Sequence, residues 1–292
     1  MSSVCAVGLA VADLVLGADR LPTGPGKHFA RSGRLVGGGP AANAAVTVAR
    51  LGGAARFVGR VGDDPLGRLI IGDLIGEGVD TDGVETVAGV GSPVSAVLVT
   101  ADGERTIINH TDARLHDDPP DRLPAADAYV ADVRWPAGAE AAMAAARDRG
   151  VAGVLDLDRT DGRVPETAIS AASHVVAAIE ALGTKDPERA LAELADRTAA
   201  WVAVTVGADG ALWLDAGEVC RLAPPAVDVV DTLGAGDVFH GAFALALAEG
   251  REAAAAARFA TAAAAVKCTR PGGRAGIPTR ADVDELEART WA

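Results

Sequence analysis

Short apolar runs alternate with longer segments of helical periodicity through the second half of the chain. The pattern predicts strands at residues 128–131, 151–155, 174–178 and 201–206, and helices at 137–149, 166–172 and 187–198. Repeated β–α units of this kind favour a parallel sheet with helices on both faces. A hairpin at 211–214 and 219–222 follows, and then a buried alanine-rich helix at 251–267 and an amphipathic helix at 282–289.

The first half of the chain combines the same units with segments of another kind. The α/β pattern continues in a strand at 4–9, a helix at 41–50, a strand at 57–61 and a helix at 66–77. Residues 14–35 contain prolines and glycines that exclude a helix and favour extended segments with turns. Strands at 94–100 and 106–110 flank Ala101-Asp102-Gly103-Glu104, whose Asp-Gly pair favours a hairpin turn. We expect these strands and the extended region to form a small accessory sheet.

The stretch at residues 230–241 joins two predicted elements through small residues. A β-branched run at 227–230 predicts a strand, and helix formers at 238–248 predict a helix. Gly234-Ala235-Gly236 lies between them and lets a ligand approach the backbone, with Asp237 at the helix start. Free N–H groups there attract an anion, and the carboxylate can take a proton from a hydroxyl. These features suit phosphoryl transfer; the alternative is an N-cap aspartate behind a flexible turn.

Polar residues also follow many of the predicted strands, where open α/β sheets bind ligands. Singly, each suits a cap or a turn. Together they predict one crevice formed by Asp13, Asp63, Asp132, Arg134, Asp156, Asp158, Thr205 and Asp237.

Composition limits the partners of this chain. The 292 residues are 49% hydrophobic but only 3% aromatic, so alanine, valine and leucine must fill the core. A net charge of −13 argues against nucleic acid or an anionic membrane as partner. Three widely spaced cysteines and the lack of a signal-like N-terminus indicate a reducing, cytoplasmic location. No apolar run is long enough to cross a bilayer.

The run Asp231-Thr232-Leu233-Gly234-Ala235-Gly236-Asp237 resembles the signature of PfkB-type, ribokinase-like carbohydrate kinases. The resemblance implies that Asp237 is the catalytic base and that the amides of Gly234, Ala235 and Gly236 hold the γ-phosphate. It implies a single kinase domain over residues 1–292. That domain is a three-layer αβα sandwich with a mostly parallel sheet and a small β-sheet lid inserted at about 14–36 and 92–111.

A second element, Gly38-Gly39-Pro40-Ala41-Ala42-Asn43, resembles the N-terminal signature of the same family. The resemblance implies that Gly38 and Gly39 approach the sugar and that Asn43 bonds a hydroxyl. Asp13 resembles the early aspartate that accepts hydroxyl bonds from the sugar. Gly62-Asp63-Asp64-Pro65-Leu66-Gly67 matches a further landmark, to which we assign an architectural role. A dinucleotide GxGxxG fingerprint and a Walker pattern are both missing, which disfavours hydride transfer and a P-loop kinase.

The resemblance also implies ATP and Mg²⁺ as cofactors. Thr205, Gly207 and Gly210 resemble the nucleotide turn, although a plain hairpin turn fits the glycines equally well. The Asn-x-x-Glu element linked to the metal reads Ala177-Ala178-Ile179-Glu180 here, so only Glu180 remains of it. Asp231 resembles a contributor to a monovalent cation site, such as one for K⁺; a strand-end cap is the equal alternative.

Substrate choice depends on cationic and amide donors. We expect Lys27, Asn109 and Arg134 to bind the anionic tail of a sugar, whereas a solvated loop lysine and a surface ion pair are the alternatives for Lys27 and Arg134. For Arg274 we favour a structural role and for His240 a packing role. Local strings resemble the sulfofructose kinase branch of the family, at 21–23 with 26–27, 36–42, 131–135, 236–241 and 267–278.

This resemblance implies phosphorylation of 6-deoxy-6-sulfofructose to its 1-phosphate. The alternatives are fructose 6-phosphate, fructose or ribose as substrate, and a catalytically silent sugar- or nucleotide-binding regulator. Because unpaired strand edges invite partners, we also expect a homodimer through the lid.

Overall fold

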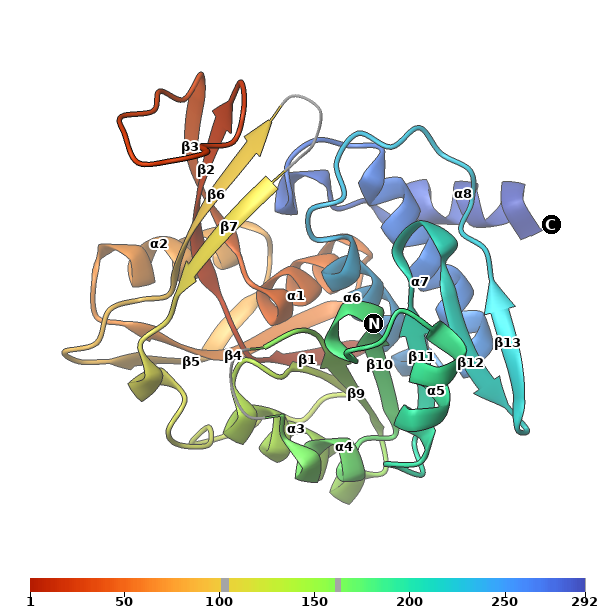
Figure 1. Ribbon diagram of the computed structural model, residues 1–292. Helices are drawn as coiled ribbons and strands as arrows, with labels where there is room; N and C mark the ends of the chain where they lie inside the picture. Colours follow the sequence, from red (N-terminus) through yellow and green to blue (C-terminus); the bar gives the residue numbers. More distant parts are fainter. Residues whose placement is uncertain (101–104, 161–163, 292) are drawn as a thin grey trace.

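The computed structural model describes residues 1–100, 105–160 and 164–291, and within them it contains two sheets (Figure 1). The predicted turn at 101–104 lies outside the described residues. The central sheet has nine strands in the order β13-β12-β11-β10-β9-β8-β1-β4-β5, parallel except at β12 and β13. Its strands, in chain order, are β1 Ser3–Val7, β4 Ala54–Gly62, β5 Asp80–Val87, β8 Ala128–Asp132, β9 Ala152–Leu157, β10 His174–Ala178, β11 Trp201–Thr205, β12 Ala211–Asp215 and β13 Glu218–Leu222.

Helices cover both faces of the central sheet and give two buried cores (Figure 1). Strand β1 shows why: Val4 and Ala6 belong to one core, and Cys5 and Val7 to the other, because side chains alternate along a strand. One core receives α1 Pro40–Arg50, α2 Pro65–Gly76, α6 Ala235–Ala248, α7 Ala253–Cys268 and α8 Arg280–Trp291. The other receives α3 Pro136–Arg149, α4 Glu166–Ala171 and α5 Pro187–Ala195. No helix in the described part of the chain is long and apolar enough to cross a membrane.

The second sheet has four strands in the order β3-β2-β6-β7 and rises from one edge of the main body (Figure 1). Its strands are β2 Val11–Ala18, β3 Ser32–Gly38, β6 Val94–Thr100 and β7 Arg105–His110. The predicted α/β sandwich with a small lid sheet is thus confirmed. Asp13 lies inside lid strand β2, and so not at the carboxyl end of a central strand as predicted.

Two sequence expectations about strands were wrong. Residues 227–230 form no strand; the amides of Val230 and Asp231 instead donate to the carbonyl of Cys268 at the end of α7, at 2.8 and 3.1 Å. The preceding Pro224-Pro225 and the exposure of Val229, at 63%, fit a connection that crosses the surface. Strand β5 was missed because Asp80, Asp82, Gly83 and Glu85 interrupt its apolar pattern.

Candidate active site

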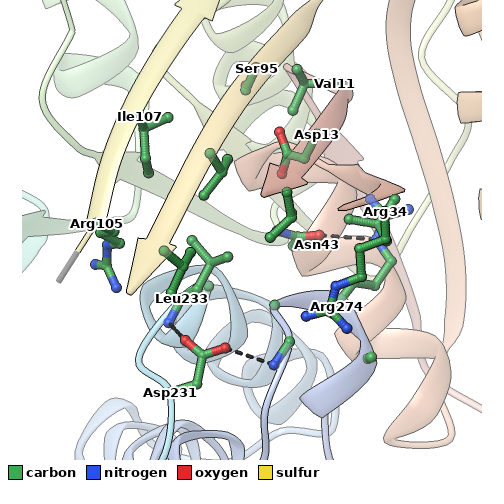
Figure 2. A pocket seen from close by; sticks show the side chains of 18 of the residues that line it. Val11, Asp13, Arg34, Asn43, Ser95, Arg105, Ile107, Asp231, Leu233 and Arg274 are labelled. Carbon is green, nitrogen blue, oxygen red and sulfur yellow. Dashed lines mark hydrogen bonds between the residues drawn. The ribbon is translucent and has the colours of Figure 1, made fainter. Parts of the chain in front are cut away.

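A cavity of about 910 Å³ lies between the lid sheet and the N-terminal ends of α1 and α6 (Figure 2). Its wall contains residues from β2, β3, β6 and β7 on one side and from the loop before α6 on the other. The structure brings most of the predicted sugar-site and catalytic residues to this cavity. The predicted residues that line it are Asp13, Gly39, Asn43, Asn109, Arg134, Asp158, Asp231, Gly234 and Asp237.

Helix α6 begins at the predicted glycine-rich turn. Gly234 is its N-cap with φ +79°, a left-handed conformation that glycine adopts without strain. The amides of Ala235, Gly236 and Asp237 come next, in the first turn, where backbone N–H groups lack helical acceptors; that of Ala235 donates to the carbonyl of Thr232 at 3.2 Å. The helix dipole adds positive potential at this end, so an anion is stabilised there.

Asp237 stands in the first turn of α6, beside this anion-accepting end. Burial raises the pKa of its carboxyl, and a hydrogen bond from Asn43 acts in the opposite direction. Asn43 Nδ2 donates to Asp237 Oδ2 at 2.7 Å. Among the described residues, none donates a hydrogen bond to Oδ1. A carboxylate with one oxygen fixed and the other open to the cavity has the geometry of a general base.

Arg274 holds Asn43 in this orientation. It lies in a short 3-10 helix, Arg274–Gly276, and its side chain is only 5% exposed. Its Nε donates to Asn43 Oδ1 at 3.0 Å (Figure 2), its Nη2 donates to the carbonyl of Gly38 at 3.1 Å, and its Nη1 pairs with Asp73 of α2. Because Arg274 can only donate, the amide oxygen of Asn43 must face it and the amide nitrogen must face Asp237. The structural role predicted for Arg274 therefore understates it.

Asp13 faces the cavity from β2, next to the glycine-rich start of α1. A Cβ on Gly38 would lie 2.1 Å from Asp13 Oδ2, and one on Gly39 would lie 2.4 Å from the carbonyl oxygen of Leu9. Gly39 also has φ +97°, so both space and backbone conformation require glycine there. Burial raises the pKa of Asp13, while a hydrogen bond with Ser95 lowers it. Asp13 is thus positioned to accept hydrogen bonds from a ligand in the cavity.

Two other predicted aspartates, Asp132 and Asp156, are buried next to the site and do not line the cavity. Asp132 ends β8 and accepts from the amides of Leu9, Ala41 and Arg134 at 2.8, 3.0 and 2.8 Å, which fixes the start of α1. Asp156 of β9 is the cross-strand partner of Asp132, and its Oδ1 lies 3.4 Å from His240 Nε2. Burial raises the pKa of Asp156 to about 7.

Asp63 and Asp64 lie away from the cavity, at the start of α2. Asp63 is exposed and lies 3.6 Å from Arg68. Asp64 is the N-cap of α2: its side chain accepts from the amide of Gly67 at 2.7 Å and from Ser92 Oγ at 2.7 Å. This segment therefore fixes backbone, as its architectural assignment requires.

Of the three residues predicted to bind the anionic tail of the sugar, two line the cavity and one does not. Asn109 and Arg134 line the cavity, whereas Lys27 is exposed in the loop between β2 and β3 and does not line it. Arg134 Nη2 donates to Asp158 at 2.9 Å, and its Nε is buried without a hydrogen-bond partner among the residues that the structure describes.

Two arginines that the sequence reasoning missed also line the cavity. Arg34 of β3 and Arg105 of β7 face it from the lid (Figure 2). Strand alternation was the available signal, because they pair across the sheet with Val15 and Val99, which line the cavity as well.

The predicted nucleotide turn follows β11. Thr205 ends that strand, Gly207 and Gly210 have φ +59° and +86°, and a Cβ on Gly210 would lie 2.0 Å from the carbonyl oxygen of Leu222. A second cavity of about 730 Å³ adjoins this turn; Val206 and Asp209 line it, and Thr205, Gly207 and Gly210 do not.

Glu180 lines the second cavity as well and is exposed. In the part of the chain that the structure describes, no cluster of three or more His, Cys, Asp or Glu side chains is arranged to hold a metal. Magnesium bound to nucleotide phosphates keeps several waters and needs only one or two protein carboxylates. A single exposed carboxylate such as Glu180 fits that requirement.

Asp231 points toward protein groups at the cavity wall (Figure 2). Its two carboxylate oxygens accept from the amides of Leu233 and Gly272 at 2.8 and 2.7 Å. The ammonium of Lys267 lies 3.8 Å from Oδ1.

Taken together, an anion-accepting helix end, a buried carboxylate beside it and a cavity lined by hydrogen-bonding side chains suit phosphoryl transfer to a hydroxyl. Comparison with known proteins agrees. The model of the pfkB family of carbohydrate kinases matches residues 1–280. The chain therefore belongs to the pfkB family and is a carbohydrate kinase.

Its relatives and structural neighbours include ribokinases. It is 30% identical to the ribokinase of Bacillus subtilis over 98% of this chain and 99% of that protein. It is 33% identical to the ATP-dependent ribose-1-phosphate kinase of Halopiger xanaduensis over 90% of both chains. A ribokinase-like protein from Agrobacterium tumefaciens superposes with a TM-score of 0.93 at 37% identity, covering 99% of this chain and 98% of that one. Arabidopsis thaliana ribokinase, solved with ribose and ATP, superposes with a TM-score of 0.85 at 28% identity over 98% of both chains.

Proposed function

We propose that the chain transfers the γ-phosphate of ATP to a hydroxyl of an anionic sugar. The observation that carries the proposal is the placement of Asp237, held by Asn43 at the N-terminal end of α6 and facing the cavity. Asp237 takes the proton of the attacking hydroxyl, whose oxygen forms a bond to the γ-phosphorus. The bond from phosphorus to the β–γ bridging oxygen breaks, and ADP leaves.

The residues around Asp237 orient the sugar and the transferred phosphoryl group. Asp13 accepts hydrogen bonds from hydroxyls, and the open backbone at Gly38-Gly39 lets the sugar ring approach. The amides of Gly234, Ala235 and Gly236 stabilise the charge on the phosphoryl oxygens. The lid sheet covers the sugar, which limits loss of ATP to water.

The nucleotide and its metal occupy the carboxyl ends of β10 and β11 in this proposal. Thr205, Gly207 and Gly210 hold the nucleotide. That ATP is the nucleotide is supported by the relative solved with ribose and ATP. Mg²⁺, when bound, neutralises charge on the phosphates, and Glu180 would hold it through water.

The sugar that we favour is 6-deoxy-6-sulfofructose, phosphorylated at its C1 hydroxyl. Asn109 and Arg134 line the cavity, and the amide of Asn109 and the guanidinium of Arg134 bring hydrogen-bond donors to the wall that a sulfonate would face. Lys27 would join them by movement of its exposed loop. Arg34 and Arg105 add positive charge to the lid wall. The relative named for ribose 1-phosphate also acts on a sugar that carries an anionic group.

Other substrates and one other function remain candidates on specific grounds. Fructose 6-phosphate would satisfy the same cations, and ribose is favoured by the ribokinase relatives; neutral fructose is the remaining sugar. A silent sugar- or nucleotide-binding regulator is favoured only by Ala177, a buried methyl group where the family pattern has asparagine.

A sugar panel tests these alternatives. Purified protein is given ATP, Mg²⁺ and each sugar in turn, and release of ADP is measured with Arg134→Ala in parallel. We expect the highest kcat/KM with 6-deoxy-6-sulfofructose. Arg134→Ala should raise the KM for that sugar about 10- to 100-fold and leave the KM for ribose unchanged, because a charged hydrogen bond contributes about 1.5–3 kcal/mol. Faster turnover of ribose or fructose overturns the substrate assignment, and binding without turnover of any sugar supports the regulator.

We also propose a homodimer formed through the lid. Residues that alternate with the cavity-lining ones on β2, β3, β6 and β7 face away from the cavity. Leu14, Leu16, Leu35, Leu98 and Ile108 are the larger apolar ones among them, and Leu14, Leu35 and Ile108 are 40%, 42% and 64% exposed. Thr106 and His110 are polar members of the same face. A second copy of this chain would bury that face. The cytoplasmic location stays a prediction.

A further inference from the structure

Lys267 is a buried lysine one position from the end of α7. Its side chain is 0% exposed. Burying an ammonium is costly unless it is paired and hydrogen-bonded. Its Nζ donates to the carbonyl oxygen of Asp231 at 2.7 Å and lies 3.8 Å from Asp231 Oδ1. Burial lowers the pKa of Lys267, and the charge of Asp231 acts in the opposite direction.

The hydrogen bonds around Asp231 join two chain segments at this point. The carboxylate accepts from the amide of Leu233 on its own side and from the amide of Gly272 on the other (Figure 2). The amides of Val230 and Asp231 donate to the carbonyl of Cys268, which follows Lys267 directly. The ammonium therefore lies where the loop before α6 meets the end of α7.

This loop leads directly to the anion-accepting end of α6. Asp231 is three residues before Gly234, the N-cap, and the amide of Ala235 donates to the carbonyl of Thr232 at 3.2 Å. Arg105 of the lid also contacts the loop: its Nη1 donates to Thr232 Oγ1 at 2.9 Å. Any shift of Asp231 would move the amides that receive the phosphoryl group.

We propose that Lys267 is a built-in cation that fixes the loop at residues 231–234 and so positions the amides of α6. This inference rests on the kinase function proposed above. The oxygens of Asp231 that would serve a monovalent cation already face Lys267, Leu233 and Gly272, so the protein needs no added K⁺. A compact ammonium suits this pocket, whereas the wider, planar guanidinium of arginine does not.

The first test uses the unaltered protein. Its sugar-kinase rate is measured in buffers whose only monovalent cation is tetramethylammonium, and again with K⁺ added at constant ionic strength. We expect rates equal within about twofold. Activation by K⁺ of about tenfold or more would overturn the proposal, because a free cation would then be part of the site.

The second test removes the charge and restores it. Lys267→Met keeps the length of the side chain, and we expect kcat to fall about 100-fold, the effect of losing one donor in an anion hole. The KM for the sugar should change little, since Asp13 and Asn43 are untouched. Added K⁺ or NH₄⁺ should raise the kcat of Lys267→Met or Lys267→Ala by at least about tenfold. Retained activity, or a loss that no cation restores, would overturn the proposal.

Arg270→Met is the matched control for the second test. Arg270 lies three residues further along and pairs with Asp282 at 2.8 Å, away from Asp231. Its loss should lower stability without creating any response to K⁺. A response equal to that of the Lys267 variants would show a general salt effect and contradict the proposal.

Hydrogen–deuterium exchange separates this inference from the proposed function. The amides of residues 230–236 should exchange faster in Lys267→Met than in the unaltered protein, and K⁺ should reverse the change. That outcome supports the positioning role even if no sugar is turned over, in which case only the kinase proposal fails. Unchanged exchange in these amides would overturn the positioning role.

Discussion

At the scale of single residues, the site depends on one hydrogen-bonded row across the cavity floor. Arg274 pairs with Asp73 and donates to Asn43, and Asn43 in turn donates to Asp237. Each of these contacts restricts the orientation of the next side chain. Asn43 has to present its amide nitrogen to Asp237 because Arg274 occupies its amide oxygen. Asp237 is therefore oriented, through Asn43, by an arginine that does not contact it.

Replacing Arg274 by methionine tests this arrangement. We expect kcat to fall about 10- to 100-fold, because Asn43 loses the charged hydrogen bond that sets its orientation. The pKa that governs the acid limb of kcat/KM should rise, since Asn43 would hold the ionised form of Asp237 less firmly. Arg50→Met is the control: Arg50 bonds the carbonyl of Ile277 in the same turn at 3.0 Å without contacting Asn43. An equal fall in kcat in both variants would assign Arg274 a structural role only.

The buried pair of Asp156 and His240 predicts a pH effect on stability. Burial raises the pKa of Asp156 to about 7; His240 attracts its charge, while Asp158, Asp237 and Asp132 repel it. The unfolded chain ionises this carboxyl near pH 4, so the native state binds more protons than the unfolded state between about pH 4 and 7. Asp156 therefore lowers the free energy of unfolding as the pH rises through that window.

Urea unfolding of Asp156→Asn measures that effect. As the pH rises from about 5 to about 8, the free energy of unfolding of the variant should increase by about 1–3 kcal/mol relative to that of the unaltered protein, because asparagine cannot ionise. Asp148→Asn, at an exposed site, should show no such gain. The same pH dependence in Asp156→Asn and the unaltered protein would contradict the assignment of this pKa.

At the scale of elements, much of the fold could be predicted from local pattern. The β–α alternation from β8 to β11 is visible in the sequence because each element is short, apolar and bounded by turns. So is the start of α6, because Gly234 and Asp237 lie in one motif. Strand β5 was hidden by its charges, and the Val227–Val230 run lacks a neighbouring strand to pair with.

The contacts that complete the site could not be predicted from local pattern. Arg274 and Asn43 are 231 residues apart, and Asp231 and Lys267 are 36 apart. Neither pair has a local signature, because long-range packing alone brings them together. Lys267 in particular has no sequence signal that separates it from a surface lysine at the end of a helix.

The position of helix α1 depends on the glycine at its N-cap, Gly39. Gly39→Ala should lower the free energy of unfolding by roughly 1–3 kcal/mol more than Gly52→Ala does. Both glycines have positive φ, at +97° and +85°, but only a Cβ on Gly39 would meet backbone, while Gly52 faces open space. Denaturant unfolding measures the loss of stability in both variants. Because the two glycines share a positive φ, the difference between the losses reports the steric clash at Gly39. Equal losses would mean that the approach of Gly39 to Leu9 does not constrain the helix.

At the scale of the whole molecule, the two faces of the lid sheet differ in chemistry. One face carries Asp13, Arg34 and Arg105 into the cavity, and the other exposes apolar side chains. Ile108→Asp on the outer face should convert a dimer into a monomer in light scattering after size-exclusion chromatography, because it buries a charge in the interface. Val219→Asp, at a comparably exposed site on β13, should leave the mass unchanged. An unaltered protein that is monomeric at all concentrations would contradict the dimer.

The most direct test of the whole account is the turnover of Asp237→Asn. Asparagine keeps the size of the side chain and can still face Asn43, but it cannot accept the proton of a sugar hydroxyl. With the sugar that the unaltered protein turns over fastest, we expect kcat to fall by at least about 100-fold. Calorimetry should show nearly unchanged binding of ATP and sugar. Turnover within about tenfold of the unaltered protein would show that Asp237 is not the base.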